Sequence, residues 1–211
     1  MTGIELIALA ASTSLLAGWR LYLVTLVTGL AMKFGFVALP DQLQALDVLA
    51  DNWVLGIAAF GTLAEFFADK IALVDSAWDA VHAFIRPVGG ALLSLAIVDA
   101  GDPAWQIASF LAGGGAAAVA HIGKAGARTL VNASPEPYSN IAVSTMEDVA
   151  TGGLLALAIA NPVAAAIVAA ILVFLSIWLA MKARRALNRL IDHLTPPRPM
   201  KDVTPPRNPA A

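Results

Sequence analysis

The stretch 162-PVAAAIVAAILVFLSIWLAM-181 contains twenty residues without a charge and is followed by Lys182, Arg184 and Arg185. Twenty residues in a helix span about 30 Å, which is the thickness of the hydrocarbon core of a bilayer. The whole chain has the same character, since 59% of its residues are hydrophobic and its mean hydropathy is +0.76. The sequence therefore predicts a protein whose main partner is the lipid bilayer.

Five further segments complete a set of six predicted spans. With residues 162–181, they are residues 4–32, 52–67, 76–98, 103–120 and 140–160. The first is longer than a span needs and is interrupted at Gly18, Trp19 and Arg20, so it is either one tilted helix or a broken one. We therefore expect an all-α fold, a polytopic transmembrane bundle of about six helices within residues 1–181.

Loop charges orient these spans. With a cytoplasmic N-terminus, residues 33–51, 99–102 and the turn at 161 lie outside, and they hold five Asp residues against Lys33 alone. The inner segments and adjoining span ends hold eight bases: Lys70, Arg86, Lys124, Arg128, Lys182, Arg184, Arg185 and Arg189. Basic residues favour the cytoplasmic side of membrane proteins. The pattern predicts a multi-pass protein with both termini in the cytoplasm.

Two of the spans contain similar octapeptides. GALLSLAI at residues 90–97 resembles GGLLALAI at residues 152–159, and each follows an inner polar segment. Under this topology both run the same way through the membrane, as in the parallel internal repeats of some transporters. A chance match between Leu- and Ala-rich spans is the alternative.

The chain changes character after residue 181. Apolar residues recur at helical spacing opposite three bases, which predicts a short basic amphipathic helix on the inner leaflet over residues 182–194. Residues 195–211 contain two Thr-Pro-Pro-Arg stretches, which favour an extended, disordered cytoplasmic tail.

Composition excludes several classes of function. The chain contains no cysteine, which rules out disulfides, thiolate metal sites and cysteine nucleophiles. Its histidines, His82, His121 and His193, are too dispersed for a metal motif. The net charge is −2 and no basic face stands out before the C-terminus, which argues against nucleic acid as a partner. We expect no metal and no cofactor.

Ionisable and polar residues within or beside the apolar runs are the candidate functional residues. A charge at the centre of a membrane helix costs about 2.5–3.5 kcal/mol on insertion scales, so such residues mark functional or structural sites. Most of these residues gather at the inner ends of the spans, whereas Arg20 and Glu147 lie deeper. The candidate solute- or ion-binding residues are Arg20, Glu65, Asp69, Lys70, Asp75, Arg86, His121, Lys124, Arg128, Glu136, Asn140, Glu147 and Asp148.

Helical spacing groups some of these candidates. Glu65 and Asp69 share one helix face, and His121, Lys124 and Arg128 share another. Acids and bases on adjacent helices can neutralise one another, which reduces the penalty of burying them. For His121, a hydrogen bond between helices is the expected role rather than a ligand role.

Simpler roles compete with a functional one for several residues. The bases near the inner ends, Arg86, Lys70 and Lys124, can snorkel to lipid headgroups and only set the topology. Adjacent residues on a helix point about 100° apart, so Glu147 and Asp148 are not expected to face one small site equally.

The segment 132-NASPEPYSN-140 is unusual at a membrane boundary. Its two prolines predict a non-helical connector. Its Ser and Asn side chains either cap the following helix or belong to a re-entrant loop that lines an aqueous vestibule.

A set of short motifs resembles an uncharacterised family of small membrane proteins. The motifs are AGWR at 17–20, LAE at 63–65, ADKI at 68–71, VD at 74–75, RP at 86–87, SPEP at 134–137, SN at 139–140 and ED at 147–148. The family is domain of unknown function 4126, found in bacteria and similar to some plastid proteins. The resemblance covers roughly residues 10–180 and implies a bacterial inner (cytoplasmic) membrane location without an activity. Ala72 departs from it, because Pro is expected there.

Three classes of function compete. The first is a small transporter or channel with a charged cytoplasm-facing vestibule, for a small solute or ion of either sign, with Glu65 or Glu147 as a proton-coupled carboxylate. The second is a non-catalytic membrane scaffold or subunit whose buried ion pairs are structural. The third, an intramembrane hydrolase using Glu147 with His121 or Arg128, lacks any recognisable catalytic motif, so we do not expect an enzyme. A second copy of the chain is a further candidate partner.

Overall fold

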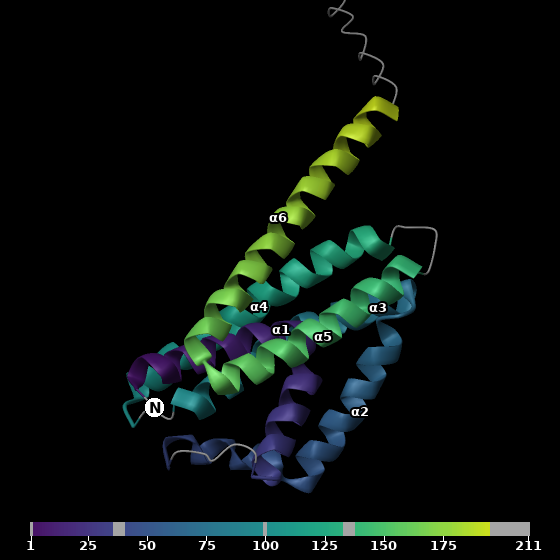
Figure 1. Cartoon of the computed structure of the whole chain (residues 1–211). Coiled ribbons are helices and arrows are strands. Elements are labelled where there is room, and N and C mark those ends of the chain that lie inside the picture. Colours follow the sequence, from purple (N-terminus) through teal and green to yellow (C-terminus); the bar gives the residue numbers. More distant parts are fainter. Residues whose placement is uncertain (1, 36–40, 99–100, 133–137, 195–211) are drawn as a thin grey trace, which may run out of the picture.

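The computed structural model describes residues 2–35, 41–98, 101–132 and 138–194, and it is all-helical over them (Figure 1). The elements in chain order are α1 (Gly3–Lys33), the 3-10 helix η1 (Asp41–Ala50), α2 (Asn52–Ala68), α3 (Ala72–Val98), α4 (Pro103–Asn132), α5 (Tyr138–Ala160) and α6 (Pro162–Leu194). The predicted all-α fold of six helices is confirmed.

Within the described ranges, four helices are long and apolar enough to cross a membrane. They are α1, α3 from Leu73, α5, and α6 as far as Lys182. α2 is apolar but shorter, with 17 residues. α4 is not among the four, although residues 103–120 were expected to span; its 30 residues include the polar positions 121, 124 and 128.

The distribution of side chains is the reverse of that in a water-soluble protein. Trp53, Leu73 and Phe84 are 80–82% exposed on the outside of the bundle. The largest fully buried side chains of the described residues include Arg20 and Arg86. Exposed aromatic and aliphatic side chains in these numbers are typical of a surface that faces lipid. The chain is therefore a membrane protein.

α1 is broken at Arg20, whose φ of −143° and ψ of 68° are not helical. Just before the break, a side chain at Gly18 would place its Cβ 2.3 Å from the carbonyl oxygen of Ala117 in α4, so only glycine fits there. The first half of α1 packs on α3, where Ser14 Oγ donates to the Gly90 carbonyl at 3.0 Å. The second half leaves the bundle beside α2 (Figure 1). Of the two expected alternatives for this segment, the broken helix is the one observed.

Local sequence explains where several helices begin. Thr2 and Glu5 form a reciprocal capping box at the start of α1. Asp51 and Asp102 each accept a backbone N–H at 2.8 Å at the starts of α2 and α4. Pro162 is the first residue of α6, a position that tolerates its missing N–H.

The break decides on which side of the bundle the N-terminus lies. The first half of α1 is about 25 Å long and leads from Gly3 to Arg20. Leu6 and Leu9 near its start pack in the same apolar cluster as Val98 and Leu157, near the ends of α3 and α5. The N-terminus thus lies at the same end of the bundle as the beginning of α4 and the turn between α5 and α6 (Figure 1).

This arrangement differs from the one assumed for the predicted topology. A cytoplasmic N-terminus was expected together with outer positions for residues 99–102 and 161. The N-terminus, the beginning of α4 and the turn between α5 and α6 instead lie at one end of the bundle (Figure 1). The prediction counted 4–32 as one crossing, whereas the chain changes direction at Arg20. The side of the membrane that each end of the bundle faces stays a prediction.

Other predicted segments have different outcomes. The octapeptides at 90–97 and 152–159 run in the same direction along the bundle, and a repeat stays a prediction. α6 continues to Leu194, so residues 182–194 are not a separate helix, and their contact with a leaflet stays a prediction. Most of the connector at 132–140, including Glu136, and the tail at 195–211 lie outside the described residues.

The topology can be tested by cysteine labelling, because the natural chain has no cysteine. Single substitutions Gly3→Cys and Gly101→Cys should react with a membrane-impermeant maleimide from the same side of intact cells or spheroplasts. Ile71→Cys, at the other end of the bundle and 57% exposed, should react only from the opposite side. The unsubstituted chain is the control, and labelling of Gly3→Cys and Gly101→Cys from opposite sides would contradict this fold.

Candidate functional site

Ten charged side chains from α1 to α5 meet inside the bundle, and we call them the ionic network. Each joins at least one other through a nitrogen–oxygen distance of 3.9 Å or less. Its bases are Arg20, Arg86, Lys124 and Arg128, and its acids are Glu65, Asp69, Asp75, Asp79, Glu147 and Asp148. All of these except Asp79 were predicted site residues.

Arg20 joins acids from two other parts of the chain. Its guanidinium forms a close ion pair with Asp69, at the end of α2. It lies 3.0 Å from Asp148 and 3.6 Å from Glu147, both in α5, and 3.9 Å from Glu65 in α2. The break in α1 therefore places a base where α2 and α5 both present carboxylates.

Glu147 and Asp148 both face Arg20, which the sequence did not predict. Nη2 of Arg20 is the nitrogen nearest to both carboxylates. Although the two side chains leave α5 in different directions, each is long enough to reach the guanidinium from its own side. The pair shares a base and remains a poor candidate for acid–base catalysis.

Arg86 in α3 links α2 and α4. It donates to Glu65 Oε1 at 2.5 Å and to Asp79 Oδ1 at 2.9 Å. It also donates to Nδ1 of His121 at 2.6 Å, while Nε2 of His121 lies 3.1 Å from the Asp79 carbonyl oxygen. These partners assign the His121 proton to Nε2. The predicted role of His121 as a hydrogen bonder between helices is confirmed.

Lys124 and Arg128 point from one face of α4 into the network, as predicted. Lys124 lies 3.4 Å from Asp69 and donates to the Trp19 carbonyl at 3.2 Å, one residue before the break in α1. A cation at this position is favourable, because a helix carries partial negative charge at its C-terminal end. Arg128 contacts Asp75 at 3.1 Å.

The bases with a predicted alternative role as headgroup anchors divide into two groups. Arg86 and Lys124 are at most 2% exposed and do not snorkel. Lys70 is partly exposed, and its ammonium lies 3.4 Å from the centre of the Phe66 ring. It also donates to Ser144 Oγ at 3.4 Å, so Lys70 borders the network without an ion pair in it among the described contacts.

Asp69 lies between α2 and α3, outside the membrane-spanning segments. Burial raises the pKa of its carboxyl, but the charges of Lys124, Arg20 and Arg128 outweigh this and hold the pKa below its ordinary value. Asp69 therefore stays ionised and acts as a fixed anchor for two bases.

A groove with several polar residues in its wall borders the network between α3 and α4. Its volume is about 460 Å³, and its polar wall includes Asp79, His121, Arg128 and Asn132. Small residues such as Ala83 make room for it. Two network residues, Asp79 and Arg128, are thus within reach of a solute in this α3–α4 groove.

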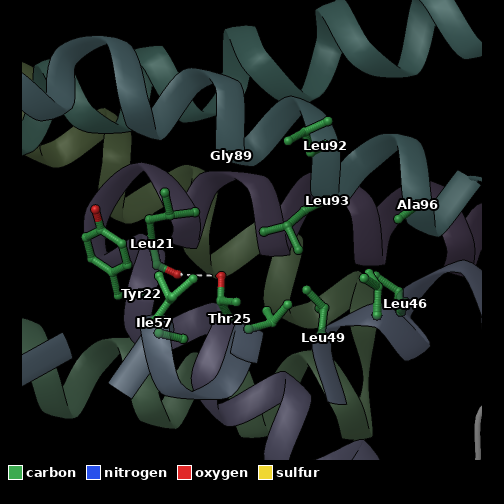
Figure 2. Close-up of a pocket in the computed structure, with 13 residues that line it drawn as sticks. Leu21, Tyr22, Thr25, Leu46, Leu49, Ile57, Gly89, Leu92, Leu93 and Ala96 are labelled. Carbon is green, nitrogen blue, oxygen red and sulfur yellow. Dashed lines mark hydrogen bonds between the residues drawn. The ribbon is translucent and has the colours of Figure 1, made fainter. Parts of the chain in front are cut away.

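A second cavity, of about 450 Å³, lies among α1, η1, α2 and α3 (Figure 2). Leu49, Ile57 and Leu93 are typical of its walls. Its hydroxyls already have partners: Thr25 donates to the Leu21 carbonyl at 2.9 Å, and Tyr22 lies 3.0 Å from Nε2 of His82. No hydroxyl among the described lining residues is left unpaired for a polar solute, which favours the network as the site for a charged solute.

Four residues at or near the site lie outside the predicted set. Asp79 is seven residues before Arg86, two helical turns, and this spacing was a usable signal. Asn132 donates to Asp75 Oδ2 at 2.6 Å. Tyr22 contacts His82, sixty positions further along the chain, and no local sequence pattern predicts this contact.

The remaining predicted residues are placed as follows. Asn140 is 3% exposed; its carbonyl accepts from Arg128 at 3.5 Å, and its side-chain amide has no hydrogen-bond partner among the described residues. Glu136 is outside the described residues. In the part of the chain that the structure describes, no group of three acidic or histidine side chains is arranged to hold a metal ion.

An apolar exterior around a buried ionic network defines a polytopic α-helical membrane protein. The family model for a domain of unknown function (DUF4126) matches residues 7–182. The chain therefore belongs to the DUF4126 family, and the match includes every residue of the ionic network. No curated protein and no solved structure matches the chain.

The Asp69 anchor predicts a pH-dependent stability difference. Asp69→Asn should lower the free energy of unfolding by about 3 kcal/mol at neutral pH, because it leaves buried bases without their partner. A carboxyl whose folded-state pKa is lowered stabilises the fold above its ordinary value of 3.8 and loses this effect as the pH falls further. The difference between wild type and variant should therefore be constant down to that pH and shrink below it.

Unfolding of the detergent-solubilised protein by heat or denaturant measures this difference. The exposed Asp47→Asn is the matched control, with an expected change within about 0.5 kcal/mol. An Asp69→Asn protein as stable as wild type at neutral pH would show that Asp69 does not anchor the network.

Proposed function

We propose that this protein is a small transporter or channel of the bacterial inner membrane and that the ionic network is its solute- or ion-binding centre. One observation carries the proposal: α1 is broken at Arg20, and the break lies within the network. In secondary transporters, broken helices place charged groups and free backbone ends around the transported species. Ionisable groups inside a membrane protein commonly mark substrate or ion pathways and proton relays.

The α3–α4 groove supports the predicted vestibule. It lies at the network end of the bundle and reaches Asp79 and Arg128 from outside. Small residues on both helices keep the space open. We propose that solutes enter the network from this groove.

We further propose that the network end faces the cytoplasm. Lys70, Lys124 and Arg128 lie at this end, whereas Asp102 lies at the other. Basic residues favour the cytoplasmic side. With the fold observed, this orientation places the C-terminal end of α6 on the cytoplasmic side and the N-terminus outside.

Flux through liposomes tests the transport proposal. Purified protein in proteoliposomes should conduct protons, alkali ions or small solutes, measured with a pH-sensitive dye, ion-selective dyes and a light-scattering swelling assay. Arg20→Gln should reduce the flux at least tenfold, because it removes the base at the break, whose guanidinium contacts acids of both α2 and α5. Arg184→Gln, at an exposed position of α6, should retain it. Absence of any flux with folded wild-type protein would contradict the proposal.

A second candidate function is a non-catalytic membrane scaffold. It is favoured by the close pairing of every base, since a network of this kind can fix helix register alone. Glu65 and Arg86, 2.5 Å apart, provide the test. Changing either residue alone to Gln should destabilise the fold, because the charge of its partner is then buried without compensation. Changing both should restore part of the stability. If the double variant also retains wild-type flux, this pair is structural.

An enzymatic activity is not part of the proposal. Both nitrogens of His121 are already engaged, by Arg86 and by the Asp79 carbonyl, so this imidazole is not free to act as a general base. Serine and cysteine nucleophiles with an adjacent base are likewise not found among the described contacts.

A further inference from the structure

The ionic network contains more acids than bases. Six carboxylates meet four bases, so the network carries a formal charge of 4 − 6 = −2 when all groups are ionised. Lys70 borders it and reduces the excess to one negative charge. A buried charge without compensation is strongly unfavourable in a medium of low polarity. The network therefore has a place for at least one additional positive charge.

Distances within the network show which carboxylate is held least. Five of the six acids have a basic nitrogen within 3.4 Å. The basic nitrogen nearest to the Glu147 carboxylate belongs to Arg20 and lies 3.6 Å away. Nitrogens of Lys124 and Arg128 follow at 3.9 Å. Its Oε2 is buried and has no hydrogen-bond partner among the described residues. Neutralising Glu147 thus breaks the fewest close contacts.

The face of α5 that carries Glu147 also offers a partner for a neutral carboxyl group. Asn140, Ser144, Glu147 and Thr151 are spaced by four, three and four residues, which places them along one helix face. Thr151 is fully buried, and no described residue forms a hydrogen bond with its hydroxyl. Buried hydroxyls without a partner are rare. A protonated Glu147 has an O–H that can donate to Thr151 Oγ1, one turn further along α5.

A proton suits this place better than a metal ion. The basic groups that face Glu147 are Arg20 of α1 and Lys124 and Arg128 of α4. Its acidic neighbours are Asp69, at the C-terminal end of α2, and Asp148, the next residue of α5. No described group of three acidic or histidine side chains could hold a metal ion at this place. A proton requires only the carboxylate oxygen and one acceptor.

We propose that Glu147 is the exchangeable proton site of the ionic network, with Thr151 as the positioning residue that accepts its hydrogen bond. The proposal rests on the transport function and makes the proton its coupling ion. On uptake, the carboxylate binds one proton and its O–H donates to Thr151. On release, the proton returns to solvent and the carboxylate again attracts the three bases. Arg128, which contacts Glu147 and lines the α3–α4 groove, marks the route to solvent.

Infrared difference spectroscopy of the full chain in lipid tests the site directly. A change of pH should produce a C=O stretching band of a protonated carboxyl group in wild type. The band should vanish in Glu147→Gln, whose amide imitates the protonated form, and persist in the matched variants Glu65→Gln and Asp148→Asn. Thr151→Val should retain the band at a higher frequency, because the carboxyl group loses its hydrogen bond.

Stability provides a second readout. Glu147→Gln should melt at or above the wild-type temperature, because it removes excess negative charge, whereas Glu65→Gln should melt clearly lower, because it strands Arg86. A band that persists in Glu147→Gln, or a wild type without a pH-sensitive carboxyl band, overturns the proposal. A Glu147 band without flux in proteoliposomes keeps the proton site and removes the transport function. Flux together with a carboxyl band that does not depend on Glu147 keeps the transport function and removes Glu147 as the proton site.

Discussion

The pairing of Arg20 with the acids of α2 and α5 is the interaction on which the rest of the structure depends. If α1 were a continuous helix, the side chain of Arg20 would point in another direction. The guanidinium would then not lie between Asp69 and Asp148, both of which it contacts. The break costs backbone hydrogen bonds, and part of this loss is offset by Lys124, which donates to the Trp19 carbonyl. The broken backbone and the charges therefore stabilise each other.

Ionic contacts have this importance because burial of apolar surface cannot assemble helices in lipid. Acyl chains are as apolar as leucine, so helix association depends on close packing and on polar contacts. Both occur here. Gly18 and Gly90 let α1 and α3 approach Ala117 of α4, at the same level as Ser14, whose hydroxyl donates across the interface. Close packing thus fixes the middle of the bundle, and the network fixes one end.

Sequence patterns predicted those parts of the fold that depend on neighbouring residues. Apolar runs gave the helices, and spacings of three and four gave the faces of α2 and α4 that carry the site. The change of direction within α1 could not be predicted, because counting charges in loops assumes that each apolar segment crosses the membrane once, and the Arg20 break violates this assumption. The partners of Arg20 and His121 could not be predicted, because helix packing selects them among several acids at the same depth.

Shared partners distinguish this network from a set of independent salt bridges. Asp69 serves both Arg20 and Lys124, and Glu65 lies within 3.9 Å of three bases. In an isolated buried pair, removing one charge strands the other in a medium where it is very unfavourable. In a shared network, the acids that remain near a released base compensate part of its charge. The same contacts can therefore hold five helices together and tolerate a change of charge at one member, which is why a structural and a transport role for these residues do not exclude each other.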